Sequence, residues 1–304
     1  MSKSTKIFII ISTVLLLCGL GAWMMLYLIF VSPSDNNRDV VIGSGEKLAV
    51  IELNGVILSA EETVRQFKKY REDRSIRGIL FRVDSPGGGV VASQEIYEEV
   101  KKTRNSGKPV VVSMGSLGAS GGYYVSCPAN KIVANPGTLT GSIGVISQFM
   151  EYDSLLGKIG VGVNTIKSGK LKDAGNPFRP MTVEDKEYFQ NLMDNVHRQF
   201  IAAVENERHL PHDSVVALAD GRVFTGEQAL NLGLIDTLGT YEDAIIIAAK
   251  IARIKGTPSI VKERKRTFSI YDRLFGETKF SELLKLKDEI FNQPILQYKL
   301  AHGF

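Results

Sequence analysis

A single serine surrounded by small residues is the feature of this sequence with the clearest chemical potential. Ser120 follows Gly118 and Ala119 and precedes Gly121 and Gly122, between a strand-like run and a helix-compatible one. A serine on such a strand-to-helix turn can present its hydroxyl to a substrate carbonyl, while amides at the helix start point the same way. Because the neighbours are small, a polypeptide could reach the hydroxyl. The segment therefore predicts a nucleophilic serine.

Two other glycine-rich segments, 83–91 and 135–146, also fall where predicted strands end. Glycines at such places usually mark tight turns, and either segment alone needs no other explanation. In the first segment, a proline is followed by Gly87, Gly88 and Gly89. Backbone N–H groups of glycines can face an oxyanion with no Cβ in the way. Gly87 or Gly88 is therefore our candidate for an oxyanion hole.

A nucleophilic serine needs a base, and no histidine is placed to supply it. The histidines lie in a predicted long helix, in the loop after it or near the end of the sequence: His197, His209, His212 and His302. No HExxH helix and no paired Cys or His cluster points to a metal, and no cofactor is predicted. The remaining candidate base is a lysine of the loop 166–178, which carries Lys167, Lys170 and Lys172.

A lysine can act as a base only when its amine is neutral. The ordinary pKa of about 10.4 keeps the amine protonated at pH 7, so burial or nearby positive charge must lower the pKa. Lowering it to about 7–8 costs roughly 3.5–5 kcal/mol, at about 1.36 kcal/mol per pKa unit. Most lysines are simply solvated, so the residue types alone do not decide among the three.

Strand-like and helix-like runs alternate from about residue 46 onward, which predicts an α/β domain with mostly parallel strand pairing. The expected strands cover 48–57, 78–85, 109–114, 131–135, 142–146 and 161–166. The expected helices cover 60–72, 91–105, 119–126, 151–158 and 183–208, with two more within 226–255. Thr182, with Asp185 three residues on, is a capping-box variant that starts the longest helix.

The amino terminus predicts a membrane span. Residues 7–34 contain no charged side chain, and at about 1.5 Å per residue such a helix exceeds a hydrocarbon core of roughly 30 Å. A cleaved signal peptide would have an apolar region of only about 7–15 residues, so we expect a transmembrane helix over 7–32. Lys3 and Lys6 precede it, which places residues 1–6 in the cytoplasm and the rest of the chain outside. In a bacterium with two membranes, the outside compartment is the periplasm.

Composition bounds the rest of the chain. The 304 residues carry a net charge of +4, but residues 35–257 are close to neutral at −1, so a nucleic-acid-binding domain is not expected. The two cysteines cannot form a disulfide framework. We expect a linker at 33–45, a globular domain at 46–257 and a C-terminal appendage at 258–304, whose basic cluster 262–266 is interpreted as a solvated face.

Four motifs occur in one order: SPGG at 85–88, GASGGYY at 118–124, TGSIGV at 140–145 and IKSGxxKD at 166–173. Together they resemble signal peptide peptidase A (SppA), the membrane-anchored serine protease family of bacteria, in its short single-repeat form. The resemblance covers about residues 46–255. It implies a ClpP/crotonase-like α/β fold with a β-β-α superhelical core, which agrees with the alternation of strands and helices.

The resemblance also implies a role for each matched residue. The nucleophile falls on Ser120, the general base on Lys172 and the oxyanion amide on Gly87. The serine that hydrogen-bonds the lysine falls on Ser142, and the amide of Gly121 joins that of Gly87 by analogy with ClpP. The other two lysines of the loop do not match the lysine of the motif.

The function implied by this resemblance is that of a membrane-anchored serine endopeptidase with a Ser/Lys dyad and no cofactor. Its substrates would be cleaved signal peptides and other extended apolar peptides, read by small pockets lined by Leu117, Val145 and Ile146. The resemblance further implies a ring- or dome-shaped homo-oligomer on the membrane. In this assembly Ser120 and Lys172 would meet across a subunit boundary.

Three alternatives stay open at this point. A ClpP-like protease with a histidine base needs that histidine at about position 145, which is Val145. A crotonase-like acyl-CoA hydrolase or hydratase would hold a thioester in a similar oxyanion hole but would normally use carboxylates. A non-catalytic membrane scaffold would keep the shell of the fold without the activity. Within the protease hypothesis, the C-terminal segment 298–304 could occupy the active-site bowl of its own assembly.

Overall fold

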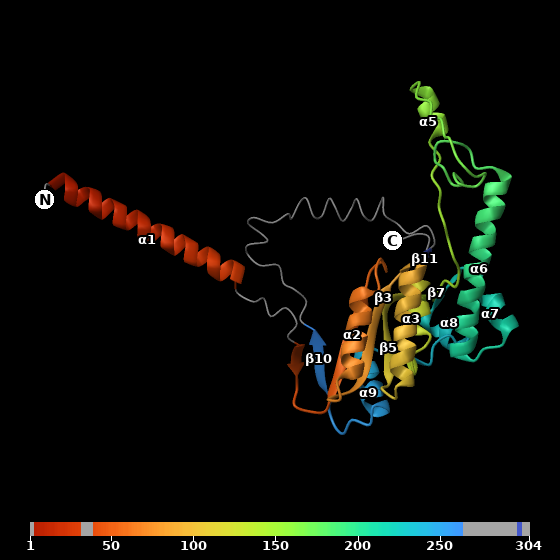
Figure 1. Cartoon of the computed structure of the whole chain (residues 1–304). Coiled ribbons are helices and arrows are strands. Elements are labelled where there is room, and N and C mark those ends of the chain that lie inside the picture. Colours follow the sequence, from red (N-terminus) through yellow and green to blue (C-terminus); the bar gives the residue numbers. More distant parts are fainter. Residues whose placement is uncertain (1–2, 32–38, 264–296, 300–304) are drawn as a thin grey trace. The chain divides into compact units, whose positions relative to one another are not determined.

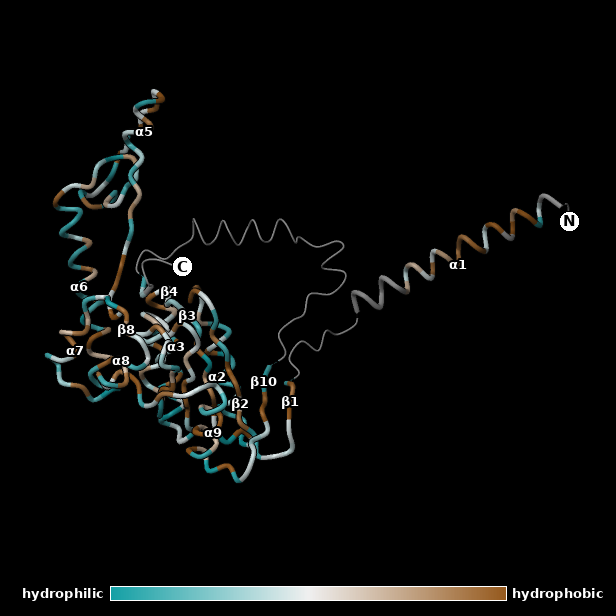
Figure 2. The backbone as a smooth tube through the Cα atoms, turned by 180° about the vertical axis from the view of Figure 1, so that it is seen from behind, coloured by the Kyte–Doolittle hydropathy of each residue, from teal (hydrophilic) through white to brown (hydrophobic). Residues whose placement is uncertain are grey.

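The computed structural model describes residues 3–31, 39–263 and 297–299, and the chain divides into two compact units (Figure 1). The first unit holds helix α1, Lys3–Val31. Its stretch Thr5–Met24 is long and apolar enough to cross a membrane, with a mean hydropathy of 2.4, and Figure 2 shows apolar residues along this helix. The expected transmembrane segment therefore corresponds to one N-terminal apolar helix. The second unit contains all the other elements described.

A mostly parallel sheet forms the centre of the second unit. Its strands, in spatial order, are β1 (Asp39–Ile42), β10 (Ser259–Glu263), β2 (Lys47–Asn54), β3 (Ile76–Ser85), β5 (Val110–Ala119), β6 (Lys131–Ala134) and β9 (Thr237–Leu238). Neighbouring strands run parallel except β1 and β10. The short strand β7 (Leu139–Gly141) pairs with the carboxyl end of β5 and, on its other side, with β8 (Val223–Thr225). The predicted α/β class is confirmed.

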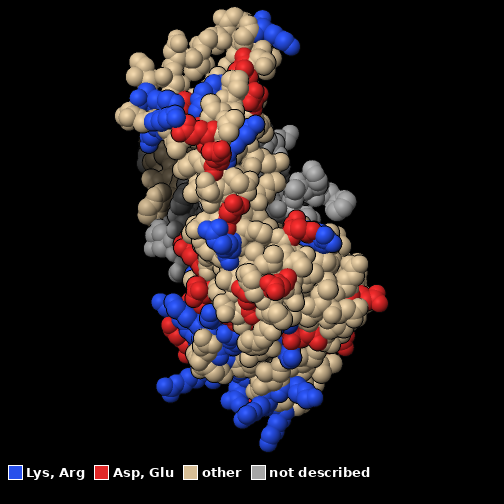
Figure 3. Space-filling view, turned by 90° about the vertical axis from the view of Figure 1, so that its right-hand side faces the viewer, with Lys and Arg blue, Asp and Glu red and all other residues tan. Residues whose placement is uncertain are grey.

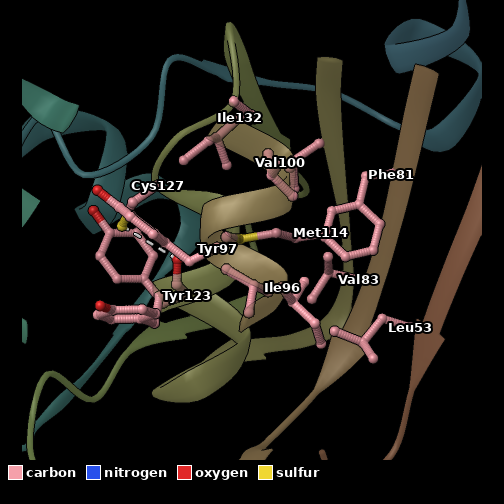
Figure 4. Packing of buried hydrophobic residues seen from close by; sticks show 14 of the residues in the cluster. Leu53, Phe81, Val83, Ile96, Tyr97, Val100, Met114, Tyr123, Cys127 and Ile132 are labelled. Atoms are coloured by element: carbon pink, nitrogen blue, oxygen red, sulfur yellow. Dashed lines mark hydrogen bonds between the residues drawn. The ribbon is translucent and has the colours of Figure 1, made fainter. Parts of the chain in front are cut away.

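Helices cover both faces of this sheet. Helices α2 (Glu61–Glu72), α3 (Val90–Asn105) and α4 (Gly121–Ser126) pack on one face, and α9 (Tyr241–Ile251) packs on the other. Side chains of β2 alternate between the two cores, with Ile51 in the first and Val50 in the second. Figure 4 shows the first core, where apolar side chains of α3 and α4 meet those of β3 and β5. Central parallel strands buried on both faces explain the long apolar runs of the sequence.

The remaining elements lie at the carboxyl ends of the strands or beside them. The long helix α6 (Val183–Arg208) begins at the predicted capping box, in which Thr182 and Asp185 exchange hydrogen bonds. Helices α7 (His212–Leu218) and α8 (Gly226–Asn231) follow. The short strand β4 (Gly87–Gly89) leads into α3 and pairs antiparallel with β11 (Gln297–Lys299), the last strand described.

Described strands also lie in the two segments expected to flank the globular domain. Strand β1 lies within the expected linker 33–45, and β10 and β11 lie within the expected appendage 258–304. These strands gain their order from distant partners, since β10 pairs with β2, more than 200 residues earlier in the chain. No local pattern carries that information. Residues 264–266, which make up most of the basic cluster, lie outside the described residues.

Two expected strands are also absent from the described structure. Residues 142–146 form only an isolated bridge at Ile146, because β7 lies three residues earlier, at 139–141. Residues 161–166 alternate in hydropathy but form no strand, and their apolar side chains are exposed. An alternating run needs a partner strand to become part of a sheet.

Residues 147–181, which we call the arm, extend away from the body of the unit after Ile146 and end at the start of α6, and α6 then leads the chain back to the body (Figures 1 and 2). The arm contains the short helix α5 (Asp153–Lys158). It carries exposed apolar side chains, among them Met150, Leu155 and Ile166, and charges of both signs (Figure 3). It packs on the first turns of α6 through Phe149 and Phe189, whose ring centroids are 4.3 Å apart.

Candidate active site

Ser120 stands at the junction of β5 and α4 with an unusual backbone. Its φ of 53° and ψ of −116° are rare for a residue with a side chain. Its amide donates to the Gly141 carbonyl at 2.8 Å, and its carbonyl accepts from the Tyr124 amide at 2.8 Å. These two bonds hold the strained turn in place, and such strain persists only where surrounding structure imposes it.

The Ser120 hydroxyl is buried and has no hydrogen-bond partner among the described residues. A buried hydroxyl without a partner costs free energy, and each such group in a folded protein calls for an explanation. The hydroxyl of a nucleophile is one explanation, because its partners arrive with a base and a substrate.

Ser142 lies next to Ser120 at the carboxyl end of the sheet. The register of β5 with β7 pairs Ala119 with Gly141, which are the last residues of the two strands, and the residue that follows each strand is a serine. Ser142 is buried and also has a positive φ, of 51°, and its amide donates to the Arg222 carbonyl at 2.8 Å. The structure thus brings two of the predicted site residues together.

The two predicted oxyanion-hole glycines also converge. Gly87 has a φ of 95°, and a Cβ placed on it would lie 2.6 Å from the Gly121 nitrogen. A Cβ on Gly121 would lie 3.1 Å from the Gly88 nitrogen. In this state the Gly87 amide donates to the Ser85 hydroxyl at 3.1 Å. Ser120 and the two glycine amides therefore share one small region in which glycine alone leaves room.

An extended segment of the same chain lies directly over this region. Strand β11 pairs antiparallel with β4, which sets Tyr298 opposite Gly88. On its other side, Gln297 exchanges backbone hydrogen bonds with Ile146, at 3.0 and 3.2 Å. A chain held between two backbones in this way is the geometry of peptide recognition by strand addition. Of the segment 298–304, residues 300–304 lie outside the described residues.

The structure places the three predicted pocket residues in different surroundings, and one of them, Ile146, contacts the extended segment. Ile146 binds β11 through its backbone. Val145 is partly buried and packs against the main core. Leu117 is also partly buried, and its amide donates to Asp84 Oδ1 at 2.9 Å.

Lys172 is not brought to Ser120 within one chain. It lies in the arm with its side chain exposed, and its amide donates to the Gly169 carbonyl at 3.1 Å. Lys167 forms an ion pair with Asp173, and Lys170 forms one with Glu184 at 2.5 Å. In the part of the chain that the structure describes, Lys172 has no ion-pair partner. It differs in this respect from the other two lysines of the loop.

An arginine fixes the loop that carries Lys172 to the helix that follows. Arg179 contacts Asp173 at 2.9 Å and Asp185, in the first turn of α6, at 2.5 Å. Its hydrogen bond lowers the pKa of Asp185 to about 2, and it holds the pKa of Asp173 well below the usual range. The Lys172 loop is therefore tied to α6 by charge-assisted hydrogen bonds.

The histidines take other positions. His197 lies on α6, and His212, at the start of α7, contacts Glu205 at 2.7 Å. None of the described histidines hydrogen-bonds the Ser120 hydroxyl, and His302 lies outside the described residues. Over the described ranges, no group of three or more His, Cys, Asp or Glu side chains gathers in a way that could hold a metal ion.

Sequence reasoning missed the aromatic residues beside the site. Tyr298 of β11 packs against Tyr124 of α4 and Phe200 of α6. Tyr124 belongs to the motif at 118–124, and an aromatic residue so close to the predicted nucleophile was a usable signal. Phe200 and Tyr298 carry no such signal, because α6 and β11 reach the site only through the tertiary fold.

Comparisons with known proteins identify the family. Residues 102–255, half of the chain, match the model of peptidase family S49. A Methanocaldococcus jannaschii protein named "Putative protease" is 37% identical over 275 residues, which cover 86% of each chain. An Enterococcus faecium protein named "Putative signal peptide peptidase SppA" is 37% identical over 215 residues, covering 66% of this chain and 62% of that protein. The chain belongs to peptidase family S49 and is a serine protease.

A solved structure is similar in part. ClpP1 from Listeria monocytogenes, in a mutant form, has a TM-score of 0.44 and 15% sequence identity, and the match covers 64% of this chain and 93% of that one.

Proposed function

We propose that this protein is a membrane-anchored serine endopeptidase whose Ser120 is activated by Lys172 of a neighbouring copy. The observation that carries the proposal is the contrast between the two side chains. The Ser120 hydroxyl is buried beside glycine amides and has no partner among the described residues, whereas the Lys172 amine is exposed on the arm. A second copy that docks the arm over Ser120 would supply the base and remove water from it.

Burial at such an interface would also make the base chemically competent. Loss of solvent disfavours the charged ammonium, so the amine becomes neutral and able to accept a proton. In the proposed site, the hydroxyl of Ser142 orients this amine.

The reaction follows from these positions. The neutral amine of Lys172 takes the hydroxyl proton of Ser120 while the Ser120 oxygen attacks the peptide carbonyl carbon. The carbonyl oxygen becomes negative and accepts hydrogen bonds from the amides of Gly87 and Gly121. The ammonium of Lys172 then gives its proton to the leaving amine as the C–N bond breaks. A water molecule repeats the sequence on the acyl-enzyme, which releases the acid and restores Ser120.

The substrates we propose are extended apolar peptides, among them remnants of cleaved signal peptides. Two observations support this class. Strand β11 shows that an extended chain fits between β4 and Ile146. The apolar helix α1 would hold the enzyme at the membrane where such peptides are released. We propose that α1 spans the cytoplasmic membrane of a bacterium, with the catalytic unit on the periplasmic or outer side.

The exposed apolar side chains of the arm support assembly into a ring or dome. Monomeric proteins rarely leave such a group of large apolar residues in water, and a second copy of the chain is the surface that would both cover them and complete the dyad.

Mixing two inactive variants tests this site. Ser120→Ala and Lys172→Ala should each abolish peptide hydrolysis by the detergent-solubilised full chain. Subunits of the two variants, dissociated and reassembled together, should recover activity, because about one site in four then pairs an intact serine with an intact lysine of a neighbour. Lys170→Ala, a matched removal of an exposed lysine two residues away, should retain activity.

Two results would contradict the proposal. Hydrolysis by purified Lys172→Ala would exclude the lysine as base. Continued inactivity of the mixed assembly, with exchange of subunits verified by mass, would exclude a site shared between copies.

A further inference from the structure

A second cavity lies at the end of the sheet opposite Ser120. Strands β3, β5 and β6 begin at this end, and helices α3 and α9 finish there. Figure 3 shows Lys and Arg side chains gathered at the lower end of the body. The cavity has a volume of about 460 Å³. We call it the arginine pocket, after three of the four residues that give it a polar lining: Arg77, Arg104, Asn130 and Arg253.

The side-chain groups left free in this lining are hydrogen-bond donors. Asn130 Oδ1 accepts from the Val110 amide at 2.8 Å, which leaves the Nδ2 group of Asn130 to donate. Arg77 Nε contacts Glu46 at 3.2 Å, but both side chains are nearly half exposed, and such a surface pair adds little. The Arg253 guanidinium has no ion pair and no hydrogen bond with the described residues.

Arg104 is positioned by an acidic side chain that does not cancel the charge of the pocket. Its Nη1 contacts Glu207 at 2.6 Å, and its Nε donates to Asn105 Oδ1 at 3.2 Å. The same Glu207 carboxylate also contacts Lys101 at 3.0 Å. One carboxylate is therefore shared by two cations, so this group of charges remains positive.

Arg253 occupies a backbone position that usually belongs to glycine. Its φ is 57°, and it is the second residue after the end of α9. Its amide donates to the Lys250 carbonyl at 3.1 Å, and the Ile254 amide donates to the Ala249 carbonyl at 2.9 Å. These two bonds form a Schellman motif, in which the left-handed residue is most often glycine. An arginine here is strained, and strain of this kind points to a role for the side chain.

Capping of helix ends does not account for the arginines. The Schellman bonds already satisfy the last turn of α9, and the Lys102 carbonyl of α3 accepts from the Ser106 amide at 2.9 Å. Lys108 shows what a capping cation looks like, since its amine donates to the carbonyls of Tyr70 and Asp73 at the end of α2. Among the described residues, Arg104 and Arg253 make no such bond to a carbonyl. Their guanidinium groups therefore remain available to a ligand.

We propose that the arginine pocket binds a phosphate group that carries a small organic substituent. A phosphate monoester has close to two negative charges at neutral pH and several acceptor oxygens, which suit guanidinium groups that come from three separate elements. A carboxylate has two oxygens and one charge, so it would engage fewer of them. The volume of the cavity lies within the usual range of small-molecule sites and leaves room for more than the phosphate alone.

This site goes beyond the proposed peptidase function. Strand β5 runs from the arginine pocket to Ser120, and its ten residues at about 3.3 Å each separate the two sites by roughly 30 Å. The phosphate group could belong to a soluble metabolite or to a lipid headgroup, and the chemistry of the pocket is the same for both.

Calorimetric titration of the detergent-solubilised full chain with glycerol 3-phosphate tests the site. Arg253→Gly should weaken binding by about 10- to 100-fold, because it removes hydrogen bonds to a charged group. The same variant should melt about 2–4 °C higher, since glycine relieves the strain, so lost binding cannot be ascribed to unfolding. Lys250→Ala, which removes an exposed cation of the same helix, should bind within about twofold of the wild-type chain.

Two further titrations identify the ligand class. Dihexanoyl phosphatidic acid should bind more tightly than glycerol 3-phosphate if the source is a lipid, and more weakly if it is a soluble metabolite. Malonate, which has two charges but no phosphate, should bind much more weakly than the better of these two probes.

Three results would overturn the proposal: no measurable binding of either phosphate probe, equal binding of malonate, or unchanged affinity in Arg253→Gly. These titrations do not depend on peptide hydrolysis, so their outcome is distinct from that of the peptidase proposal.

Discussion

The carboxyl end of the sheet and the arm contain the two halves of one proposed site, and they are built in opposite ways. Around Ser120 the chain is buried, strained and held by backbone hydrogen bonds from β7 and α4. Around Lys172 the chain is exposed and held mainly by the ion pairs of Arg179. The first region resembles a finished active site, whereas the second resembles a surface that needs a partner.

This difference suggests that one part of an active site can be fixed within each subunit while another part is completed only by assembly. Donors aimed at an oxyanion must be fixed before the reaction, because their value lies in avoiding reorganisation. A lysine base differs from these donors, because its amine stays protonated in water. The amine becomes neutral and able to accept a proton only when a second surface covers it. In the proposed site, placing the base on an exposed arm would make its activation depend on assembly.

The largest effect on activity is expected from a methyl group added next to Ser120, at Gly87. Gly87→Ala places a Cβ 1.9 Å from the Tyr298 oxygen and 2.6 Å from the Gly121 nitrogen, so it should block both the bound chain and the oxyanion amides. We expect kcat to fall by about 10²–10³-fold, the usual cost of losing one oxyanion donor. Steady-state hydrolysis of a fluorogenic peptide measures this effect.

Gly107→Ala is the matched control for backbone strain. Gly107 has a similar φ of 85° but no atom within 4 Å of the added Cβ. It should lose about 1 kcal/mol of stability and keep its activity. Comparable loss of activity in both variants would mean that strain alone, and not the site, explains the effect at Gly87.

A smaller effect is expected from loosening the arm. Arg179→Ala removes the contacts with Asp173 and Asp185, so the Lys172 loop is no longer held to α6. Turnover should fall by about 10- to 100-fold through misplacement of the base, while the melting temperature of the body changes little. Arg198→Ala, on the exposed face of the same helix, should leave turnover unchanged. A large drop in melting temperature for Arg179→Ala would show that the arm also stabilises the body.

Acid should open the arm before the body. The lowered pKa of Asp185 means that its stabilising contribution is complete above the ordinary pKa of about 3.9 and is lost as the pH falls towards about 2. Pepsin, added briefly across this range, should cut within the arm at the acid end, and the fragments can be mapped by mass spectrometry. In Arg179→Ala the arm should be cut at every pH at which pepsin acts. Cleavage that starts in the sheet would reverse the proposed order of stability.

The smallest effect is expected in the reactivity of Cys127, whose labelling rate measures how readily the region around Ser120 opens. Its thiol lies at the end of α4, and burial raises its pKa to about 12. In a Cys18→Ser background, iodoacetamide at pH 8 should label Cys127 at least about 100-fold more slowly in the native protein than in denaturant. Rapid labelling of the native protein would show that α4 opens readily. The region around Ser120 would then not be the rigid half of the proposed site.

Much of the fold could be predicted because its signals are local. The apolar runs at 48–57 and 78–85 predicted strands, which the structure has at Lys47–Asn54 and Ile76–Ser85, and the capping box at Thr182 predicted the start of α6. The glycine-rich segments likewise predicted the region where Ser120, Gly121 and Gly87 now lie together. In each case the physical requirement, burial or a special backbone conformation, falls on neighbouring residues.

The remaining features depend on contacts between distant residues. Strand β10 becomes ordered by pairing with β2, and Tyr298 becomes buried by packing on α4 and α6. Residues 161–166 show the reverse case, since their alternation predicted a strand but the arm offers them no partner strand among the described residues. Local residue preferences can favour a strand, but the strand forms only where a partner strand is available to pair with it.

The position of β10 also has a consequence for how the protein is made. Ribosomes release the chain from its amino terminus, so α1, β1 and β2 emerge long before residue 263. Since β10 lies between β1 and β2, β1 cannot pair in the sheet, and β2 lacks one of its two neighbouring strands, until almost all of the globular unit has been synthesised. A nascent chain would therefore expose an open strand edge throughout its synthesis, and holdase chaperones that bind extended segments would find their target there.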